Sequence, residues 1–190
     1  EIDNLGDVWC STLQGVFSFS PKSEKSRCFY KQDGLQGNHF GLRSSFKDEK
    51  GAIYFGGKTG YTTIVPQEID YNLTPPKILI TGFEVFNKER HFDKPIERTK
   101  TIKLDYRENY FTIKFSALNY VQSSKNEYAY KLEGFNDDWV HCDKQNFASY
   151  TSLPGGEYTF RVKGSNNDGV WNEEGTSVKI VVTPPFWQTW

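Results

Sequence analysis

The chain has 190 residues, no methionine, and a formal net charge of −1 with acidic and basic residues interspersed. This charge balance argues against a nucleic-acid partner. No apolar run approaches the roughly 18 residues of a membrane span, and no signal peptide opens the chain. Because no methionine is present, not even at position 1, we interpret the sequence as an internal fragment. Its many glycines and aromatic residues favour strands and tight turns over helices.

The first 66 residues contain a repeat with a spacing of 45 residues. The matching positions are Gly6, Trp9, Thr12, Gly15, Phe19 and Pro21 in the first copy and Gly51, Tyr54, Gly57, Gly60, Ile64 and Pro66 in the second. A spacing of roughly 40–50 residues with strand-like content is typical of a β-propeller blade. We expect residues 1–66 to be terminal blade repeats of a larger ring. Unless the missing blades are supplied elsewhere, they should be strained, partly ordered or packed on another chain.

Each copy of the repeat predicts two strands, at 8–11 and 16–19 in the first and at 52–55 and 61–64 in the second. Residues 33–38 form a turn-rich connector between the copies. The large aromatic residues Trp9 and Tyr54 should then pack between neighbouring blades. A linker is predicted at 67–76, where paired prolines resist both helix and ladder pairing.

Residues 77–183 contain about seven segments of alternating polar and apolar residues and no helical pattern. The predicted strands are 77–86, 101–104, 110–116, 127–132, 139–141, 157–163 and 177–182. Such alternation implies one buried and one solvated face for each strand. The whole chain is thus predicted to be all-β, with partial propeller repeats followed by an immunoglobulin- or fibronectin III-like β-sandwich of antiparallel layers.

The sharpest local pattern runs from Tyr150 through Leu153-Pro154-Gly155-Gly156 to Tyr158. It predicts a corner between two sheets, closed by a tyrosine whose hydroxyl bonds to upstream backbone while its ring stays in the core. A hairpin turn is predicted farther on at 166–171, with Gly169 where a positive φ is needed.

From about residue 110 to 183 the chain resembles the triple-tyrosine (Y_Y_Y) domain. That domain ends the periplasmic sensor region of many bacterial hybrid two-component receptors. The matching residues are Leu118, Asn119, Tyr120, Tyr130, Gly134, Trp139, Tyr150, Leu153, Pro154, Gly156, Tyr158, Val162, Asn166, Gly169 and Trp171. The repeats at 1–66 are similar to the last blades of the propellers that precede this domain. The segment 184–190 is similar to the exit segment before the membrane helix.

This resemblance implies a non-catalytic fragment of a sensor histidine kinase. It implies a homodimer through the sandwich and an oligosaccharide ligand bound mainly by propeller parts absent here. It also implies a periplasmic location, with a membrane anchor just after Trp190. The cluster of Phe186, Trp187 and Trp190 is consistent with an interfacial aromatic belt.

Nothing in the sequence predicts catalysis, a cofactor or a metal site, because His39, His91 and His141 lack the spacing of metal ligands. Cys10, Cys28 and Cys142 are expected to be buried thiols, although Cys10 and Cys28 share a repeat and could pair.

The aromatic residues invite a sugar-stacking interpretation, but strand register favours core packing for most of them. Core positions are expected for Trp9, Tyr54, Tyr120, Tyr130 and Tyr158. Trp139 and Trp171 flank turns and should be partly exposed at an edge.

Two other classes of protein fit parts of the pattern. One is a non-catalytic accessory module of a secreted glycan-degrading propeller enzyme, and the other, less favoured by this architecture, is a cytosolic scaffold. About 20 apolar residues beyond Trp190 would favour the receptor over the accessory module.

Overall fold

A computed structural model describes residues 1–136 and 138–185, and its regular structure is almost entirely β-strand. The all-β class predicted from the sequence is confirmed. The chain divides into two compact units, Glu1–Tyr71 and Asn72–Trp190. The predicted domain limits and linker stay predictions. The predicted exit segment from residue 186 onward lies outside the described residues.

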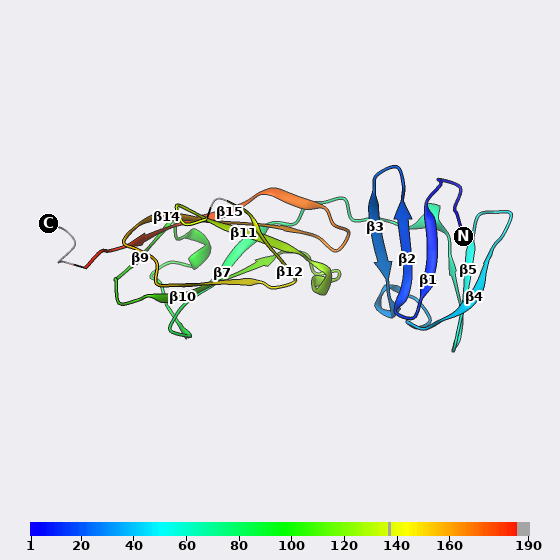
Figure 1. The fold of residues 1–190 in the computed structure, drawn as a ribbon, viewed down its shortest axis with the longest axis horizontal. Helices are drawn as coiled ribbons and strands as arrows, with labels where there is room; N and C mark the ends of the chain where they lie inside the picture. Colours follow the sequence, from blue (N-terminus) through cyan, green and yellow to red (C-terminus); the bar gives the residue numbers. More distant parts are fainter. Residues whose placement is uncertain (137, 186–190) are drawn as a thin grey trace. The chain divides into compact units, whose positions relative to one another are not determined.

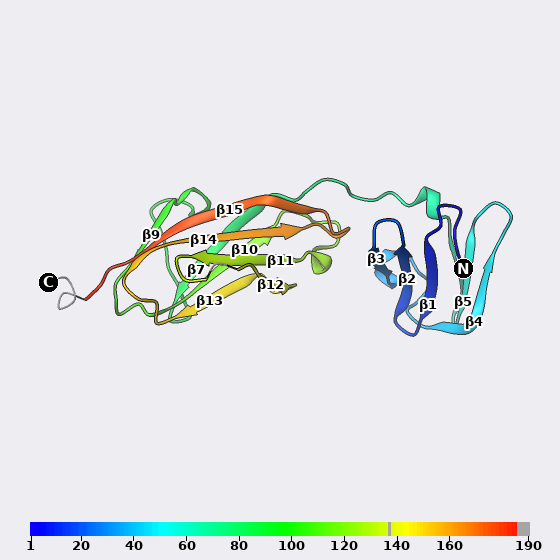
Figure 2. The same cartoon turned by 45° about the horizontal axis from the view of Figure 1, so that its top comes forward.

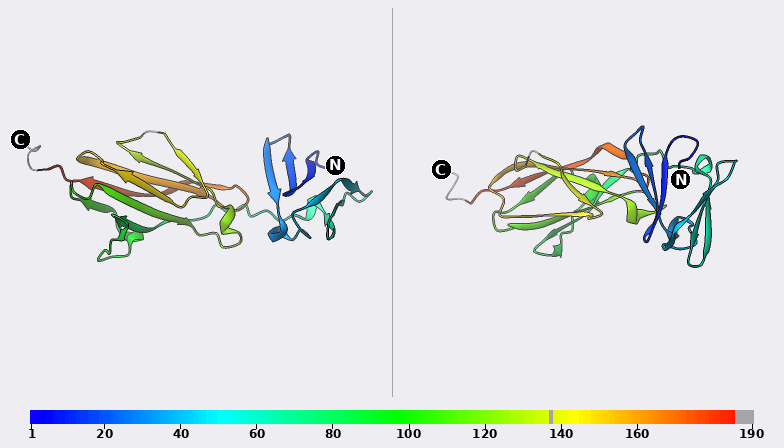
Figure 3. Two further views of the ribbon diagram at one scale, coloured as in Figure 1. Left: turned by 60° about the horizontal axis from the view of Figure 1, so that its bottom comes forward. Right: turned by 45° about the vertical axis from the view of Figure 1, so that its right-hand side comes forward.

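The first unit consists of two three-stranded antiparallel sheets. The strands are β1 (Val8–Thr12), β2 (Gly15–Ser20), β3 (Lys25–Phe29), β4 (Phe40–Lys47), β5 (Ile53–Gly57) and β6 (Gly60–Ile64), with short 3-10 turns η1 (Lys31–Asp33) and η2 (Pro66–Glu68). Strands β1, β2 and β3 lie side by side in Figure 3 (left) and form one sheet, and β4, β5 and β6 form the other. Residues 1–66, expected to be strained or partly ordered, thus form six strands.

An apolar cluster lies between these two sheets. It contains Trp9, Val16, Leu35, Phe40, Ile53, Phe55 and Ile64, with Phe29 and Ile69 packed against it. The ring of Phe29 stacks on Trp9, with their centroids 5.4 Å apart. Trp9 is therefore a core residue, as predicted, with only 2% of its surface exposed.

Tyr54 is not in this cluster, and the prediction of a core position for it is wrong. It lies half-buried on the opposite face of its sheet, beside Phe46 and Tyr61. The reason is that the two sheets contact each other through different faces of the repeat. The Trp9 face of the first sheet meets the Ile53 and Phe55 face of the second, so within the first unit no sheet covers the opposite face, which carries Tyr54.

The second unit is a sandwich of two sheets. Its strands are β7 (Ile78–Val85), β8 (Lys88–Glu89), β9 (Thr101–Leu104), β10 (Tyr110–Ala117), β11 (Tyr128–Glu133), β12 (Val140–Asp143), β13 (Phe147–Thr151), β14 (Gly156–Ser165) and β15 (Trp171–Val182), with 3-10 turns η3 (Ile96–Arg98) and η4 (Ser123–Lys125). One sheet has the order β13-β10-β7-β8 and the other β12-β11-β14-β15-β9. In Figure 1, β14 and β15 lie above β7 and β10.

Side chains that alternate inward from both sheets fill the sandwich core. Fully buried members include Phe83, Phe111, Phe115, Leu132, Phe160 and Ile180. On β14 the inward residues are Tyr158, Phe160 and Val162, separated by outward polar residues. This is the alternation that the sequence predicted for a half-buried strand.

The sandwich departs from the prediction in two respects. The structure contains β8 and β13 in addition to the predicted strands, and β15 begins at Trp171 rather than Ser177. The layers are also not wholly antiparallel, because β9 pairs in parallel with the end of β15 (Figure 2). A parallel partner needs a long crossover connection, and local strand patterns carry no signal for it.

The expectation of buried cysteines is wrong for two of the three, because Cys10 and Cys28 are exposed while Cys142 is half-buried. No disulfide joins Cys10 to Cys28. They lie on β1 and β3, each paired with Phe17 of the central strand β2, and so two strands separate them. Bridging Cα atoms must lie within about 7 Å, whereas two strand spacings already exceed 9 Å.

Candidate functional site

A buried asparagine at the turn between β14 and β15 holds together the end of the sandwich next to the predicted linker. Asn166 is only 1% exposed. Its Oδ1 accepts hydrogen bonds from the backbone N–H groups of Asp168 and Val170, at 2.9 and 3.0 Å. These bonds fix a hairpin turn in which Gly169 adopts a φ of 73°, a conformation that glycine takes without a Cβ penalty.

The amide nitrogen of the same side chain points to the linker. Nδ2 of Asn166 donates to the carbonyl oxygens of Asn72 and Thr74, at 2.6 and 3.0 Å. All four hydrogen bonds that a primary amide can form across its oxygen and nitrogen are thus made by one side chain. Asn166 joins the turn and the linker into one hydrogen-bonded unit.

Two further side chains hold the same segment of the linker. Oδ2 of Asp168 accepts from the backbone N–H of Asn72 at 2.8 Å, and Nδ2 of Asn172 donates to the carbonyl of Pro76 at 2.8 Å. Oδ1 of Asn172 accepts from the N–H of Gly175 at 3.0 Å. Gly175 has a φ of 61° and lies against the carbonyl of Val162, so a Cβ there would clash. We call Asn166, Asp168 and Asn172 together the linker clamp.

Three further asparagine side chains, those of Asn119, Asn126 and Asn167, extend the hydrogen-bond network of the clamp. The amide of Asn119 donates to Oδ1 of Asn126 at 2.8 Å and to Oδ1 of Asn167 at 3.0 Å. Asn167 in turn donates to the carboxylate of Asp168 at 2.9 Å. Asn119 and Asn126 are buried, and a buried amide without partners would be costly. This network therefore connects the clamp to the segment that follows β10.

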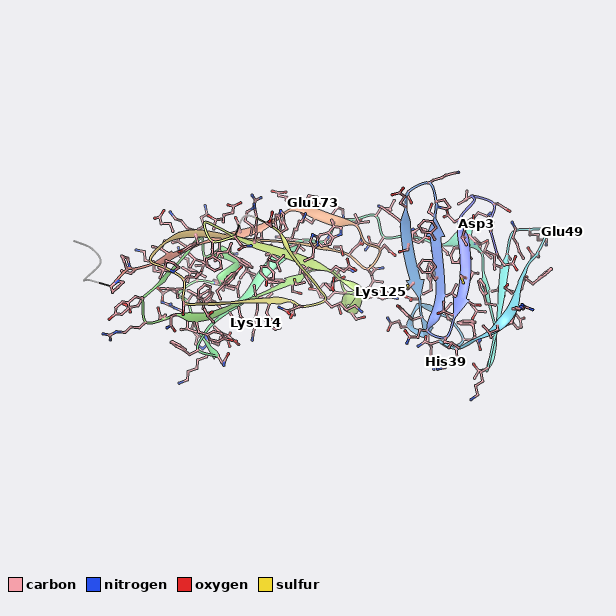
Figure 4. The ribbon with its side chains drawn as sticks, in the orientation of Figure 1. Asp3, His39, Glu49, Lys114, Lys125 and Glu173 are labelled. Atoms are coloured by element: carbon pink, nitrogen blue, oxygen red, sulfur yellow. The ribbon has the colours of Figure 1, made fainter. Side chains whose placement is uncertain are left out.

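The two tryptophans of the predicted motif lie on the outer face of the five-stranded sheet. The ammonium of Lys163 lies 4.7 Å from the ring centre of Trp139 and 5.6 Å from that of Trp171, in cation–π contact with both. Glu173, labelled in Figure 4, pairs with Lys163 at 2.8 Å. Both tryptophans are half-buried, as the sequence predicted. On this outward face Ala129 is completely buried.

Tyr158 forms the hydrogen bond expected of a tyrosine corner. Its hydroxyl donates to the carbonyl of Pro154 at 2.9 Å, and its ring is buried. Gly134, at a φ of 93°, lies against this ring, and a Cβ at Gly134 would come within 3.2 Å of it. The corner thus accounts for the small residue at 134.

Tyr130 and Tyr150 come together inside the sandwich, with ring centres 6.3 Å apart in an edge-to-face arrangement. Burial raises the pKa of both hydroxyls above the usual value of 10, and more strongly for Tyr150. The nearby thiol of Cys142 has its pKa raised by burial to about 11. None of these groups is ionised near neutral pH, and their roles are in packing.

Tyr120 is not a core residue, and this prediction is wrong: its surface is 86% exposed. The inward residues of β10 are Phe111, Ile113, Phe115 and Ala117, and the buried Asn119 continues this register, so that Tyr120 falls on the outward side. Leu118 is also exposed. The remaining motif residues lie around the corner. Leu153 is half-buried against the core, Pro154 is exposed, and Gly156 is half-buried beside Tyr158.

Sequence reasoning assigned Asp168 to a turn and treated Asn72 as linker, but did not connect them. It missed Asn126 and Asn172 altogether. The available signal was the density of asparagines at 166, 167 and 172, because buried amides commonly bind irregular backbone.

Within residues 1–136 and 138–185, no three His, Cys, Asp or Glu side chains gather in a way that could hold a metal ion. None of the helices in the described ranges has the length and apolar character needed to cross a bilayer.

Comparison with known proteins finds a family model that matches part of the sandwich. Residues 119–183 match the Y_Y_Y domain. The whole chain is similar to Histidine kinase P4 of Formosa agariphila, with 33% identity over 195 residues, covering 99% of this chain and 14% of that protein.

Solved structures give the same result. The extracellular domain assigned to the hybrid two-component system BT3049 of B. thetaiotaomicron superposes with a TM-score of 0.79 at 25% identity, covering 97% of this chain and 26% of that one. The extracellular domain assigned to the hybrid two-component system BT4673 of the same organism gives a TM-score of 0.55 at 26% identity. This match covers 96% of this chain and 24% of that one. This chain is therefore similar to a histidine kinase and to extracellular domains of two-component systems. It spans only a small part of the length of these relatives.

The residues of the linker clamp lie within the segment that matches the Y_Y_Y domain, and the backbone that they bind precedes it. Asn166, Asp168 and Asn172 fall within residues 119–183, whereas Asn72 and Pro76 precede them. The clamp thus joins the Y_Y_Y domain to the chain segment that enters it.

Proposed function

We propose that the chain is the membrane-proximal part of a periplasmic sensor, in which the sandwich relays the binding of an oligosaccharide to a membrane helix. The relatives support the sensor role, since they are a histidine kinase and extracellular domains assigned to hybrid two-component systems. They favour this function over an accessory module of a secreted enzyme. The fragment itself relays and does not catalyse.

Residues 1–66 are, in this proposal, the last repeats of a propeller. The support is that each copy of the repeat buries the face that the other exposes. Val16 is 1% exposed, whereas its counterpart Tyr61 is 69% exposed. Conversely, Ile53 and Phe55 are buried, whereas their counterparts Val8 and Cys10 are exposed.

This head-to-tail packing has a structural consequence. When two equivalent units pack through different faces, each unit keeps one unused face. If the same contact is repeated from unit to unit, and the rotation between neighbouring units adds up to a full turn, the units form a closed ring. The unused faces here carry Phe46, Tyr54 and Tyr61 at one end and Val8, Phe17 and Phe19 at the other. Further blades of the same kind would cover both.

The observation that carries the relay is the linker clamp. A signal from the propeller must pass through residues 72–76, and Asn166 binds two carbonyls of that segment while it also fixes the β14–β15 turn. Because β15 ends at Val182, a displacement at the clamp is transmitted along the strand that leads to the predicted exit segment. The signal requires two states with different ligand affinity.

The test is the conservative variant Asn166→Asp in the full receptor, with Asn109→Ala as control. The aspartate keeps Oδ1, which accepts the two N–H groups of the turn. It replaces the amide nitrogen by a charged oxygen, so both hydrogen bonds to the linker are lost and this oxygen faces the carbonyls of Asn72 and Thr74. Asn109 is an exposed residue of the β9–β10 connection. We expect oligosaccharide affinity to be unchanged and ligand-dependent phosphorylation to fall at least tenfold in Asn166→Asp alone. A normal response in both variants would contradict the relay.

The sandwich is also proposed as the dimer-forming part, and the parent chain as anchored in the inner membrane just after Trp190. Sedimentation of residues 72–190 at high concentration tests the first statement, since that span is a compact unit by itself. We expect a symmetric dimer that a crosslinker traps. A monomer at all concentrations would argue against it.

A further inference from the structure

An arginine of β3 holds the part of the predicted linker that leaves the first unit. The guanidinium carbon of Arg27 lies 4.1 Å from the ring centre of Tyr71. Both side chains are half-buried. Two residues before Tyr71, Ile69 packs against the apolar cluster between the two sheets. The first unit therefore holds the connecting segment as far as Tyr71, its last residue.

Arg27 has a fixed place in the first sheet. It pairs with Ser18, which pairs in turn with Trp9, so the three side chains share the face that carries the buried tryptophan. The Nε of Arg27 is buried, and no group in residues 1–136 or 138–185 forms a hydrogen bond with it. A guanidinium can still be stabilised by the face of an aromatic ring, because its flat cation stacks there. The ring of Tyr71 supplies that face.

The linker clamp binds the chain at the very next residue. The N–H of Asn72 donates to Asp168 at 2.8 Å, and its carbonyl accepts from Asn166 at 2.6 Å. Oδ1 of Asn72 also accepts from the N–H of Thr74 at 3.1 Å, and two prolines follow. Because a peptide group is planar, only two backbone torsions, ψ of Tyr71 and φ of Asn72, lie between the two attachments.

We propose that Arg27 and Tyr71 are the input anchor of the relay, through which a displacement of β3 reaches Asn72 and the clamp. This inference rests on the proposed relay and adds the residues through which the signal enters it. A flexible linker of several residues lets its two ends move independently, but here no residue remains between the two attachments. Arg27 is a positioning residue, because it acts through Tyr71 and not through a ligand.

Limited proteolysis of the 190-residue chain tests the anchor itself. Chymotrypsin cleaves after aromatic residues, and the bond after Tyr71 lies between the two attachments. Cleavage of a locally opened site follows its equilibrium population, so Arg27→Met, which loses the cation but keeps an unbranched apolar side chain, should be cut there about fivefold faster. Arg27→Lys keeps a cation for the ring and should be cut more slowly than Arg27→Met.

The matched control for this measurement is Lys25→Met, at an exposed position two residues earlier on β3. It should leave the rate of cleavage after Tyr71 unchanged. Mass spectrometry identifies the product that begins at Asn72. Equal rates in Arg27→Met and Lys25→Met would overturn the anchor.

A pair of glycines inserted between Tyr71 and Asn72 adds slack to the joint and leaves both attachments in place. In the full receptor, we expect this insertion to keep oligosaccharide affinity and to lower ligand-dependent phosphorylation about tenfold. The control is the same insertion between Lys22 and Ser23, in the exposed turn between β2 and β3, which should respond normally.

The outcome separates this inference from the relay on which it rests. A normal response with glycines in the joint, in a receptor whose response Asn166→Asp lowers, would overturn the input anchor and leave the relay standing. A normal response in Asn166→Asp would contradict the relay and, with it, the anchor.

Discussion

The indole Nε1 of Trp9 donates a hydrogen bond of 2.9 Å to Oδ2 of Asp3. The other oxygen of Asp3 accepts the backbone N–H groups of Leu5 and Asp7, at 2.8 and 2.9 Å. In the second copy of the repeat, the hydroxyl of Tyr54 donates to Asp48 at 3.2 Å, and Asp48 accepts the N–H groups of Lys50 and Ala52 (Asp3 is labelled in Figure 4). The repeat is thus an aspartate-centred turn capped by an aromatic donor.

This turn predicts a pH dependence for the first unit. Burial acts to raise the pKa of Asp3, but the hydrogen bonds from Trp9, Asp7 and Leu5 outweigh it, so that the pKa lies below 3.8. A carboxyl with a depressed folded-state pKa contributes stability above its unfolded pKa and loses it as the pH falls through the folded value. We therefore expect the first unit to lose stability below about pH 4.

Asp3→Asn should weaken this acid dependence, and the part that Asp48 contributes should remain, because the pKa of Asp48 is also lowered where its hydrogen bonds outweigh burial. At pH 7 it should lower the free energy of unfolding of the first unit by about 1–3 kcal/mol, because the amide nitrogen meets the indole N–H donor of Trp9 in a buried site. Glu49→Gln, at an exposed position of the equivalent turn, is the control. The measurement is urea unfolding followed at the Trp9 indole resonance. An acid-dependent loss of stability as large in Asp3→Asn as in the unmodified chain would contradict the assignment.

The aspartate turn also illustrates what the sequence could and could not predict. Asp3 and Asp48 have the same 45-residue spacing as the glycines, so the pattern was available, but a short polar side chain gives no periodic signal. The face of Tyr54 could not be predicted, because alternation defines two faces and not which one meets a neighbour. The exposure of Tyr120, in contrast, follows from the register of β10, in which Phe115, Ala117 and Asn119 are the buried positions. The strands of the sandwich were predictable since their alternation extends over many residues.

The clamp was beyond sequence reasoning for a different reason. Its contacts join residues more than 90 positions apart, as in the bond from Asn166 to Asn72. Local patterns indicate that a turn exists at 166–171, but not which backbone its side chains bind. The tyrosine corner was predictable because Tyr158 and Pro154 are only four residues apart.

Tyr158→Phe should destabilise the sandwich by about 1 kcal/mol, since it removes one hydrogen bond to the carbonyl of Pro154 and keeps the ring. Tyr120→Phe, at an exposed tyrosine of the same domain, should have no measurable effect. Denaturant unfolding of both variants under identical conditions gives the comparison. Equal midpoints for the two variants would argue against a stabilising corner.

Lys163→Met should cost about 1 kcal/mol, because methionine retains the aliphatic packing over Ala129 but loses the cation–π contacts with Trp139 and Trp171. The control is Lys179→Met on the neighbouring strand β15, where Lys179 forms an exposed ion pair with Glu157. Exposed pairs contribute little, and we expect a change of less than about 0.5 kcal/mol. The loss in Lys163→Met should be insensitive to salt if the rings, and not Glu173, supply most of the interaction.

Alkylation of the cysteines distinguishes an isolated pair of sheets from a piece of a ring. In the 190-residue chain, iodoacetamide at pH 8 should modify the exposed Cys10 and Cys28 quickly. Cys142 should react at least tenfold more slowly, because burial raises its pKa to about 11 and only the thiolate is the nucleophile.

In the complete sensor region, a preceding blade would cover the face of β1, β2 and β3 that carries Cys10 and Cys28, as the first sheet covers Ile53 and Phe55 here. We therefore expect both thiols to become as slow as Cys142 there, and to react again once urea unfolds the propeller. Mass spectrometry of the modified peptides measures all three rates in one experiment. Rapid modification of Cys10 in the complete sensor region would contradict the head-to-tail packing, because its counterpart in the second copy, Phe55, is fully buried by the first sheet.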